Sequence, residues 1–325
     1  MTVPGPTLPG PTLPDRSPAG RSLPDRTLGR LISGLECGDP GAAAALDRLW
    51  RGAARAWVVG LSGPPGVGKS VLTGRLLHAA AGCRRAVLAV DPSSPISGGA
   101  VLADRMRLQA MGVPADVFVR SLASRGALGG LSAVVPKAIR LLEAAGYELV
   151  LLETVGVGQN ETDVMGVADT VVVVQAPGAG DEIQGLKSGL LEIADIFVLN
   201  KCDLDGVEQA RAVLRDVARQ PRDGWQVPVV STVATAGTGI DALWRAAGQH
   251  RDWLAGSGHL ARRRERRLAA ELIAAADIEL KQRLADLGLI ERFGDGKITV
   301  RDALAEIFGH QDGPVRTATK AEQRR

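Results

Sequence analysis

The stretch GLSGPPGVGKSVLTGRLL, residues 60–77, constrains the fold of this chain more than any other part of its sequence. It contains the spacing G-x-x-x-x-G-K-S, formed by Gly63, Gly68, Lys69 and Ser70. An apolar run, WVVGL, precedes the glycines and a helical pattern follows them, which is the context of a phosphate-binding loop. The alternative is a glycine-rich turn with a chance lysine and serine, and these flanks argue against it. We therefore predict a nucleotide-binding loop between a strand and a helix.

The chemistry of such a loop explains its residue types. Glycines allow backbone N–H groups to converge on phosphate oxygens, and the following helix presents the positive end of its dipole. Lys69 would reach the β- and γ-phosphates of the nucleotide, and the Ser70 hydroxyl would bind Mg²⁺. The residues predicted to contact the nucleotide here are Gly63, Pro64, Pro65, Gly66, Val67, Gly68, Lys69, Ser70 and Val71.

Two acidic residues at the ends of predicted strands are candidate magnesium ligands beside Ser70. Asp91 follows the apolar run AVLAV, and Glu153 ends the run LVLLE. A lone aspartate after a strand more often forms a turn or caps a helix. Two acids after two strands of one sheet favour a metal site, because Mg²⁺ prefers carboxylate oxygens as its protein ligands.

A second motif, Asn200-Lys201-Cys202-Asp203, follows the apolar run 196–199 and has the form N-K-x-D. A carboxylate at its fourth position can accept hydrogen bonds from N1–H and the exocyclic N2–H of guanine, whereas adenine has neither donor there. Asn200 would brace the neighbouring loops, and the stem of Lys201 would cover the base. A strand-ending turn is the alternative. The position of the motif after the phosphate loop and Glu153 favours guanine, and so GTP.

Apolar runs alternate with helical patterns along the middle of the chain, which indicates a parallel sheet covered by helices on both faces. We predict an α/β fold: a P-loop NTPase with a mostly parallel sheet, plus small N- and C-terminal helical regions. The runs predicted to be strands are 56–61, 85–90, 117–119, 149–152, 170–175, 196–199 and 227–230.

The chain of 325 residues is long enough for one nucleotide-binding domain and a smaller second region. A repetitive Pro-, Gly- and Leu-rich start and a polar end indicate disordered tails. The predicted parts are a Pro-rich tail at 1–26, a helical segment at 27–54, the P-loop domain at 55–255, a helical region at 256–310 and a tail at 311–325.

Charge and cysteine content argue against several classes of function. A formal net charge of +3, with acidic and basic residues interspersed, gives no indication of nucleic-acid binding. The three cysteines are far apart and never form C-x-x-C, so the sequence favours a reducing cytoplasm over a disulfide framework or a cysteine metal site. We find no signal peptide and no apolar run of roughly twenty residues, and so expect no membrane association.

Taken together, the motifs closely resemble those of the MeaB/ArgK/MMAA family, the methylmalonyl-CoA mutase-associated GTPases. The resemblance runs from about residue 28 to residue 253, whereas a generic P-loop protein shares only the first motif. It rests on GPPGVGKS, AVDPSSPISGGAVLADRMRL, VRSLASRGALGGL, AGYELVLLETVGVGQNETDV, PGAGDEIQGLKSGLLEIADIFVLNKCD and GTGIDALW.

The resemblance implies a Mg²⁺-dependent GTPase that acts as a chaperone for an adenosylcobalamin-dependent acyl-CoA mutase. GTP hydrolysis would gate cofactor loading and removal of damaged cobalamin, with a cobalamin adenosyltransferase as a further candidate partner. The family's homodimers imply that 256–310 is a dimerisation region. Asp91, Asp104 and Glu153 match the magnesium-site acids of the family. The resemblance places a first switch at 93–104, a second at 153–161 and a mobile element that faces the partner at 178–187.

The chain departs from the family pattern beside the base. Val233-Ala234 stands where the family has Ser-Ala, so a side-chain contact with guanine is lost. The backbone N–H of Ala234 is predicted to face the base oxygen. The candidate catalytic residues are Lys69, Glu153 and Gln159. By analogy with other GTPases, Gln159 is a candidate for positioning the attacking water.

Alternatives remain for both the function and the C-terminal helices. The protein could be a kinase of a transport component, or a nucleotide-dependent scaffold that does not require hydrolysis. The basic run RRRERR, residues 262–267, is expected to be a solvated helix face rather than a contact for an acidic partner. The apolar stripe from Leu268 to Leu287 could fold back onto the nucleotide domain, but we expect a subunit interface.

Overall fold

The computed structural model describes residues 23–50, 52, 56–91, 112–123, 131–154, 166–178 and 190–309. These residues belong to two compact units, one within residues 1–272 and the other within residues 273–325. The predicted domain boundaries, including the one at residue 256, stay predictions. Asp104, Gln159, the tail at 311–325 and nearly all of the three predicted switch segments lie outside the described residues, as does the side chain of Asp91.

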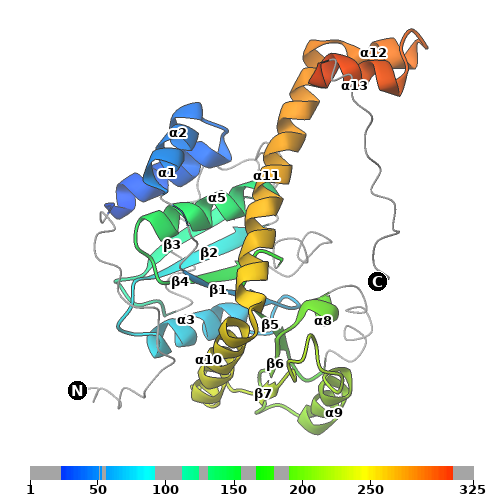
Figure 1. Ribbon diagram of the computed structural model, residues 1–325. Helices are drawn as coiled ribbons and strands as arrows, with labels where there is room; N and C mark the ends of the chain where they lie inside the picture. The colour runs from blue at the N-terminus through cyan, green and yellow to red at the C-terminus, as the bar shows by residue number, and fades with distance from the viewer. Residues whose placement is uncertain are drawn as a thin grey trace. The chain divides into compact units, whose positions relative to one another are not determined.

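A seven-stranded, all-parallel sheet forms the centre of the first unit (Figure 1). Its strands are ordered β3-β2-β4-β1-β5-β6-β7, which confirms the predicted parallel sheet. The bounds are Trp57–Ser62 (β1), Arg85–Asp91 (β2), Phe118–Ala123 (β3), Leu149–Thr154 (β4), Thr170–Gln175 (β5), Ile196–Leu199 (β6) and Val229–Ser231 (β7).

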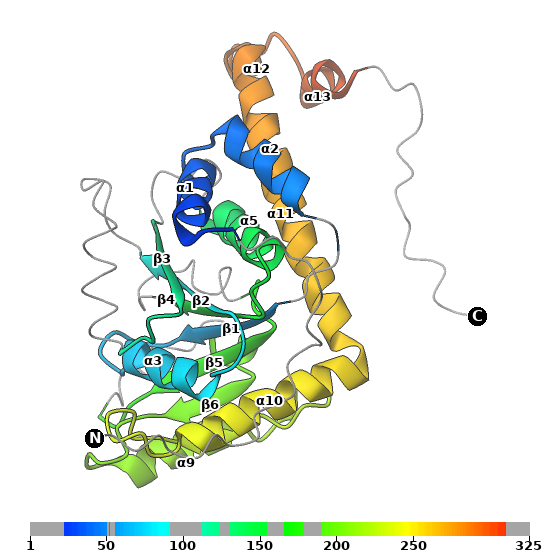
Figure 2. The ribbon, with the colours of Figure 1, turned by 90° about the vertical axis from the view of Figure 1, so that its left-hand side faces the viewer.

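Helices cover both faces of this sheet, with α3 and α10 on one face and α1 and α5 on the other (Figure 2). The predicted P-loop-type α/β class is therefore confirmed. The helices of the first unit are Asp25–Glu36 (α1), Pro40–Leu49 (α2), Lys69–Ala79 (α3), Leu131–Ala144 (α5), Leu190–Ile193 (α8), Val207–Val217 (α9), Ile240–Ser257 (α10) and the start of His259–Asp286 (α11).

The sequence of β5, TVVVVQ, shows why the central strands are continuous apolar runs. Val171 and Val173 pack in the core on one face, and Val172 and Val174 pack in the core on the other. Successive side chains of a strand point to opposite faces, so a strand covered on both sides needs apolar residues at every position. If apolar and polar residues alternated along the strand, one face of the sheet would lack an apolar core.

The two edge strands differ most from their predicted bounds. β3 runs from Phe118 to Ala123, beyond the predicted 117–119, and β7 is shifted from the predicted 227–230 to Val229–Ser231. Arg120 in β3 is only partly buried and pairs with Glu36 of α1. Edge strands accept such polar residues, so apolar runs underestimate their length.

The prediction of a solvated face for the RRRERR run is wrong for three of its arginines. Arg267 is 2% exposed and lies 3.2 Å from Glu143, and Arg264 approaches Asp169. Arg263 contacts a third acid of the nucleotide domain. Helical spacing puts these arginines on one side of α11, but the acids lie far away in the sequence, so no local pattern reveals the pairing.

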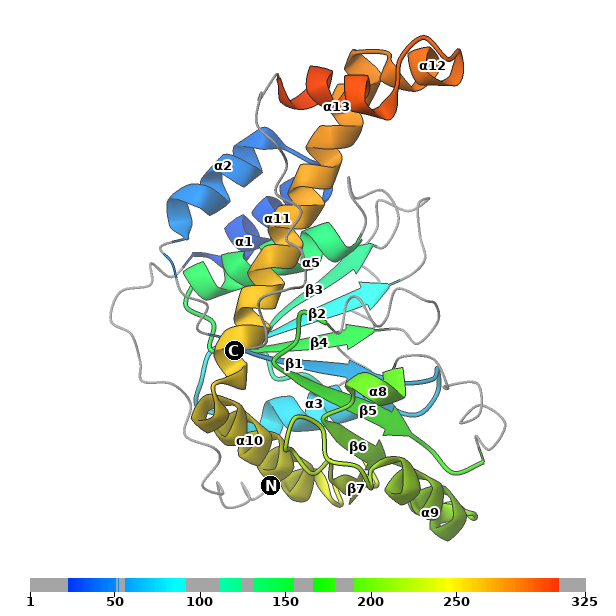
Figure 3. The ribbon, with the colours of Figure 1, turned by 45° about the vertical axis from the view of Figure 1, so that its right-hand side comes forward.

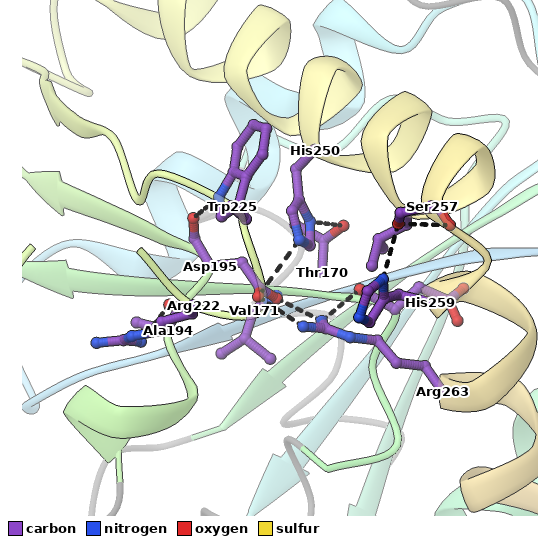
Figure 4. Close-up of polar contacts among 12 residues, drawn as sticks. Thr170, Val171, Ala194, Asp195, Arg222, Trp225, His250, Ser257, His259 and Arg263 are labelled. Atoms are coloured by element: carbon purple, nitrogen blue, oxygen red, sulfur yellow. Dashed lines mark hydrogen bonds and ion pairs between the residues drawn. The ribbon is translucent and has the colours of Figure 1, made fainter. Parts of the chain in front are cut away.

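The acid that Arg263 contacts is Asp195, which is buried at the amino end of β6 (Figure 4). Its carboxylate accepts hydrogen bonds from both Nη atoms of Arg263, at 2.6 and 2.8 Å, and from the backbone N–H of Val171 at 2.8 Å. His250 of α10 lies 3.3 Å away through Nε2, and its Nδ1 is 3.0 Å from the Thr170 hydroxyl. The Asp195 carboxylate therefore holds α11 to the sheet, and His250 of α10 lies beside it and contacts Thr170 of β5.

The second unit contains the rest of α11 and the helices Leu289–Gly294 (α12) and Val300–Phe308 (α13). Arg292 and Glu306 form a two-pronged ion pair, with N–O distances of 2.7 and 2.8 Å. The Thr299 hydroxyl caps the first turn of α13, and Asp302 completes a capping box. Among the described residues, no helix is long and apolar enough to cross a membrane.

Burial of His250 predicts a loss of stability in mild acid. Burial lowers the pKa of its imidazole to about 4, although neighbouring Asp195 acts in the opposite direction. An unfolded histidine has a pKa near about 6.5, so the unfolded chain binds more protons between these values and stability falls as pH falls through this window. The expected loss from this residue between pH 7.5 and pH 5 is about 2 kcal/mol.

Urea unfolding of the wild type and of His250→Gln at both pH values measures this difference. The variant should be less pH-sensitive by about that amount. His78→Gln, at an exposed histidine, is the matched control, and its stability should change between the two pH values as much as that of the wild type. If the stability of His250→Gln also changes as much as that of the wild type, the assignment is contradicted.

Candidate nucleotide site

The glycine-rich loop, Glu153 and the N-K-x-D motif lie at the carboxyl edge of the sheet, toward which the strand arrows point (Figure 3). The glycine-rich loop connects β1 to α3, the strand–loop–helix context that its sequence predicts. Gly63, Gly66 and Gly68 adopt positive φ angles of 140°, 79° and 96°. Such angles are unfavourable for other L-residues, so the spacing of the glycines matches the path of the backbone.

Two of these glycines are also required by close packing. A Cβ atom at Gly63 would lie 2.1 Å from the carbonyl oxygen of Val174 in β5. A Cβ atom at Gly68 would lie 2.4 Å from Nδ2 of Asn200. The loop is therefore pressed against the ends of the neighbouring strands, and its shape depends on the sheet.

Lys69 is the first residue of α3, and its side chain is buried within the loop. Its ammonium group donates hydrogen bonds to the carbonyl oxygens of Gly63 and Pro64, at 2.5 and 2.8 Å. Val67 is buried, whereas Pro65 and Gly66 are exposed. The positive charge thus lies inside the loop that would surround the phosphates.

Glu153, at the end of β4, lies beside the start of α3 and is 7% exposed. Its Oε1 accepts a hydrogen bond of 2.5 Å from the Ser70 hydroxyl, and its Oε2 accepts one of 3.0 Å from the Thr73 hydroxyl. Thr73 was not predicted from the sequence, although it lies three residues after Ser70 and so on the same side of the helix.

The hydroxyl and carboxylate oxygens of Ser70 and Glu153 are hard donors of the kind that Mg²⁺ binds. Asp91 ends β2, which pairs with β4, so its backbone lies at the same edge of the sheet. The described residues alone contain no group of three or more His, Cys, Asp or Glu that could hold a metal. The donor chemistry therefore fits Mg²⁺ at Ser70 and Glu153, with further ligands needed.

Asn200 joins the phosphate loop to the loop that follows β7. Its Nδ2 donates to the carbonyl of Val67 at 2.8 Å. Its Oδ1 accepts from the Thr232 hydroxyl at 2.9 Å and from the Ala234 N–H at 3.0 Å. The Ala234 N–H, expected to face a base oxygen, thus donates within the protein in this structure, and its contact with a base stays a prediction.

The other two residues of the N-K-x-D motif follow β6 directly. Lys201 adopts a left-handed backbone conformation with φ of 57°, and Asp203 is exposed. The backbone N–H of Cys202 donates to the carbonyl of Thr232 at 3.1 Å, which ties this motif to the loop after β7. An exposed carboxylate beside a braced loop is suited to bind the edge of a base.

A parallel sheet with a P-loop, a strand-end glutamate and an N-K-x-D motif at one edge defines a P-loop GTPase. The family model described as methylmalonyl-CoA mutase-associated GTPase MeaB matches residues 28–287. The chain therefore belongs to the MeaB family of GTPases.

Relatives and a crystal structure show the same similarity. A Pyrococcus abyssi protein described as a GTPase is 42% identical over 254 residues, covering 76% of this chain and 78% of its own length. The methylmalonic aciduria type A homolog of Mus musculus is 38% identical, over 64% of this chain and 52% of its own length. The crystal structure of an LAO/AO transport system kinase has 26% identity and a TM-score of 0.59, covering 88% of this chain and 97% of that one.

Gly63 and Gly66 form a matched pair for testing the packed loop. Gly66→Ala introduces strain at a positive φ but no close contact within 4 Å, and should reduce stability by about 1 kcal/mol. Gly63→Ala adds a collision with a backbone carbonyl and should cost about 3 kcal/mol or more. Urea unfolding without nucleotide measures both. Equal losses would show that the approach to β5 is not tight.

Proposed function

We propose that this GTPase is a chaperone that gates adenosylcobalamin loading on an acyl-CoA mutase and protects or reactivates that enzyme. The observation that carries the proposal is the match over residues 28–287 to a family described as mutase-associated. The similarity to the mouse methylmalonic aciduria type A homolog supports the same assignment. A cobalamin adenosyltransferase is a second proposed partner, because it would supply the cofactor. The three free cysteines are consistent with a cytoplasmic setting, which cell fractionation would test.

In the proposed site, the loop from Gly63 to Val71 surrounds the phosphates. The Lys69 ammonium group gives up its hydrogen bonds to the loop carbonyls and donates to phosphate oxygens instead. It thereby stabilises the charge that develops on the γ-phosphoryl group. Ser70 and Glu153 hold Mg²⁺ together with Asp91 and Asp104, and the ion neutralises phosphate charge when bound. Thr73 fixes the Glu153 carboxylate through its hydrogen bond.

Base and water recognition complete the proposed site. Asp203 accepts the N1–H and N2–H donors of guanine, and the stem of Lys201 covers the base. Asn200 keeps the loop of Ala234 next to the phosphate loop. Gln159 positions the attacking water. We place the nucleotide-sensing switches at 93–104 and 153–161, and the partner-facing element at 178–187.

Hydrolysis by the purified protein tests the whole proposal. The expected result is turnover of GTP but not ATP, abolished by EDTA, and stimulated by one acyl-CoA mutase in either its apo or its cobalamin-loaded form. Lys69→Ala should reduce turnover by at least about 100-fold, because a preorganised phosphate contact is lost. No binding or stimulation by any mutase would overturn the chaperone role. Mutase protection by a variant that binds GTP without hydrolysing it would favour a scaffold.

The name of the similar crystal structure favours a second candidate, a kinase acting on a transport component. In that case the γ-phosphoryl group would pass to a protein hydroxyl rather than to water. GTP labelled at the γ-phosphate separates the two: label on protein supports the kinase, and label only in free phosphate supports the GTPase.

We also propose that the second unit pairs with a second copy of the chain. Its helices expose large apolar side chains, which is unusual for a surface that remains in water. We expect a second copy of the chain to cover these side chains, because two such small apolar units can bury each other, whereas one unit has little core of its own. The exposed residues of this unit are Ile273, Leu287, Ile290, Phe293, Val300, Leu304 and Phe308.

Light scattering after size exclusion tests this pairing. The wild type should have twice the chain mass of 33.9 kDa, and Ile290→Ser combined with Phe293→Ser should reduce the mass to that of one chain. Leu204→Ser is the control, since Leu204 is an exposed apolar residue of the first unit. A monomeric wild type, or a variant that remains dimeric, would contradict the proposal.

A further inference from the structure

The loop after β7 is bound by Arg75, a residue of α3 that belongs to none of the motifs. Its Nε donates to the carbonyl oxygen of Ala234 at 3.0 Å, and its Nη2 donates to that of Thr235 at 2.5 Å. α3 is the helix that begins at Lys69, directly after the phosphate loop. One guanidinium therefore connects the phosphate-loop helix to the proposed base loop.

This loop is a tight turn that its own backbone hydrogen bonds and Asn200 also hold in place. Val233 and Thr238 form an isolated bridge, and the Gly237 N–H donates to the Ala234 carbonyl at 3.2 Å. The side chain of Val233 has no hydrogen-bonding group. A carbonyl oxygen can accept two hydrogen bonds, so the Ala234 carbonyl binds Arg75 as well as the Gly237 N–H, and Arg75 also binds the Thr235 carbonyl.

The two peptide groups on either side of Ala234 are consequently each bound by a side chain. Its N–H donates to Asn200, which also binds Val67 of the phosphate loop. Its C=O accepts from Arg75. A small rotation of this residue would move the N–H that we expect to face a base oxygen, so both contacts control where that donor points.

We propose that Arg75 is a positioning residue that sets the affinity and specificity for guanine. The proposal rests on the proposed function of this loop as the base-binding loop. Guanine presents an acceptor at its 6-position, whereas adenine presents an amino donor there. A well-placed backbone N–H therefore favours guanine and disfavours adenine, and a displaced one loses that distinction. The planar fork of arginine suits two neighbouring carbonyls, which a lysine ammonium does not match.

Equilibrium binding of GDP and ADP to wild type, Arg75→Ala and Arg75→Lys tests this role. The phosphates of the two ligands are the same, so their affinity ratio reports on the base alone. Arg75→Ala should weaken GDP binding about five- to twentyfold and change ADP binding less than about twofold, given the usual strength of charged hydrogen bonds. Arg75→Lys should recover only part of the ratio. Because Arg75 is exposed and Arg75→Lys retains its stem and charge, both variants should fold.

Arg222 provides the matched control. It also donates through two nitrogens to backbone carbonyls, those of Ala194 and Leu191, but it does so at the amino end of β6. Arg222→Ala should reduce thermal stability and leave the GDP to ADP ratio unchanged. A merely structural role for Arg75 would give the same pattern.

The outcomes separate the two proposals. If the wild type prefers GDP and Arg75→Ala keeps that preference, the role of Arg75 is overturned while the base site stands. If the wild type binds GDP and ADP equally, the base site itself fails, and the role of Arg75 fails with it. A reduced ratio in Arg75→Ala, with an unchanged ratio in Arg222→Ala, supports the assignment.

Discussion

Parallel pairing of β1 with β4 and β5 is the constraint on which the rest of the site depends. It places Gly63 and Glu153 at one edge of the sheet, and the parallel pairing of β5 with β6 brings Asn200 to the same edge, although the three residues are far apart in the sequence. The carbonyl of Val174 then limits the phosphate loop to glycine at position 63. The motifs are short because the sheet, rather than the local sequence, supplies most of their geometry.

Much of this edge could be predicted from the sequence, since the central strands are buried on both faces. The predicted bounds of β5 and β6 match those observed, and β1 and β4 differ at their ends only. Because these strands were recognised, the glycine-rich motif could be placed between a strand and a helix. Prediction was poorer where residues have mixed surroundings, as at β3, where Arg120 interrupts the apolar pattern of an edge strand.

Side-chain pairing between distant segments could not be predicted in the same way. The basic run of α11 is a helix surface by its local pattern, but three arginines find acids on α5 and at the amino ends of β5 and β6. Thr73 and Arg75 were missed for a related reason. Each bonds a residue roughly 80 or more positions away, and neither has a motif of its own.

The contacts that were missed lie at the two ends of the parallel strands and have different roles there. At the amino end, Asp195, His250 and Thr170 follow one another as in a catalytic triad, but all three are buried, so the cluster has a structural role where α10 and α11 pack on the sheet. At the carboxyl end, α3 contributes Lys69, Ser70, Thr73 and Arg75 from its first two turns. The phosphate loop, Glu153 and the loop after β7 are therefore all in contact with one helix, α3. A displacement of α3 would alter all three together.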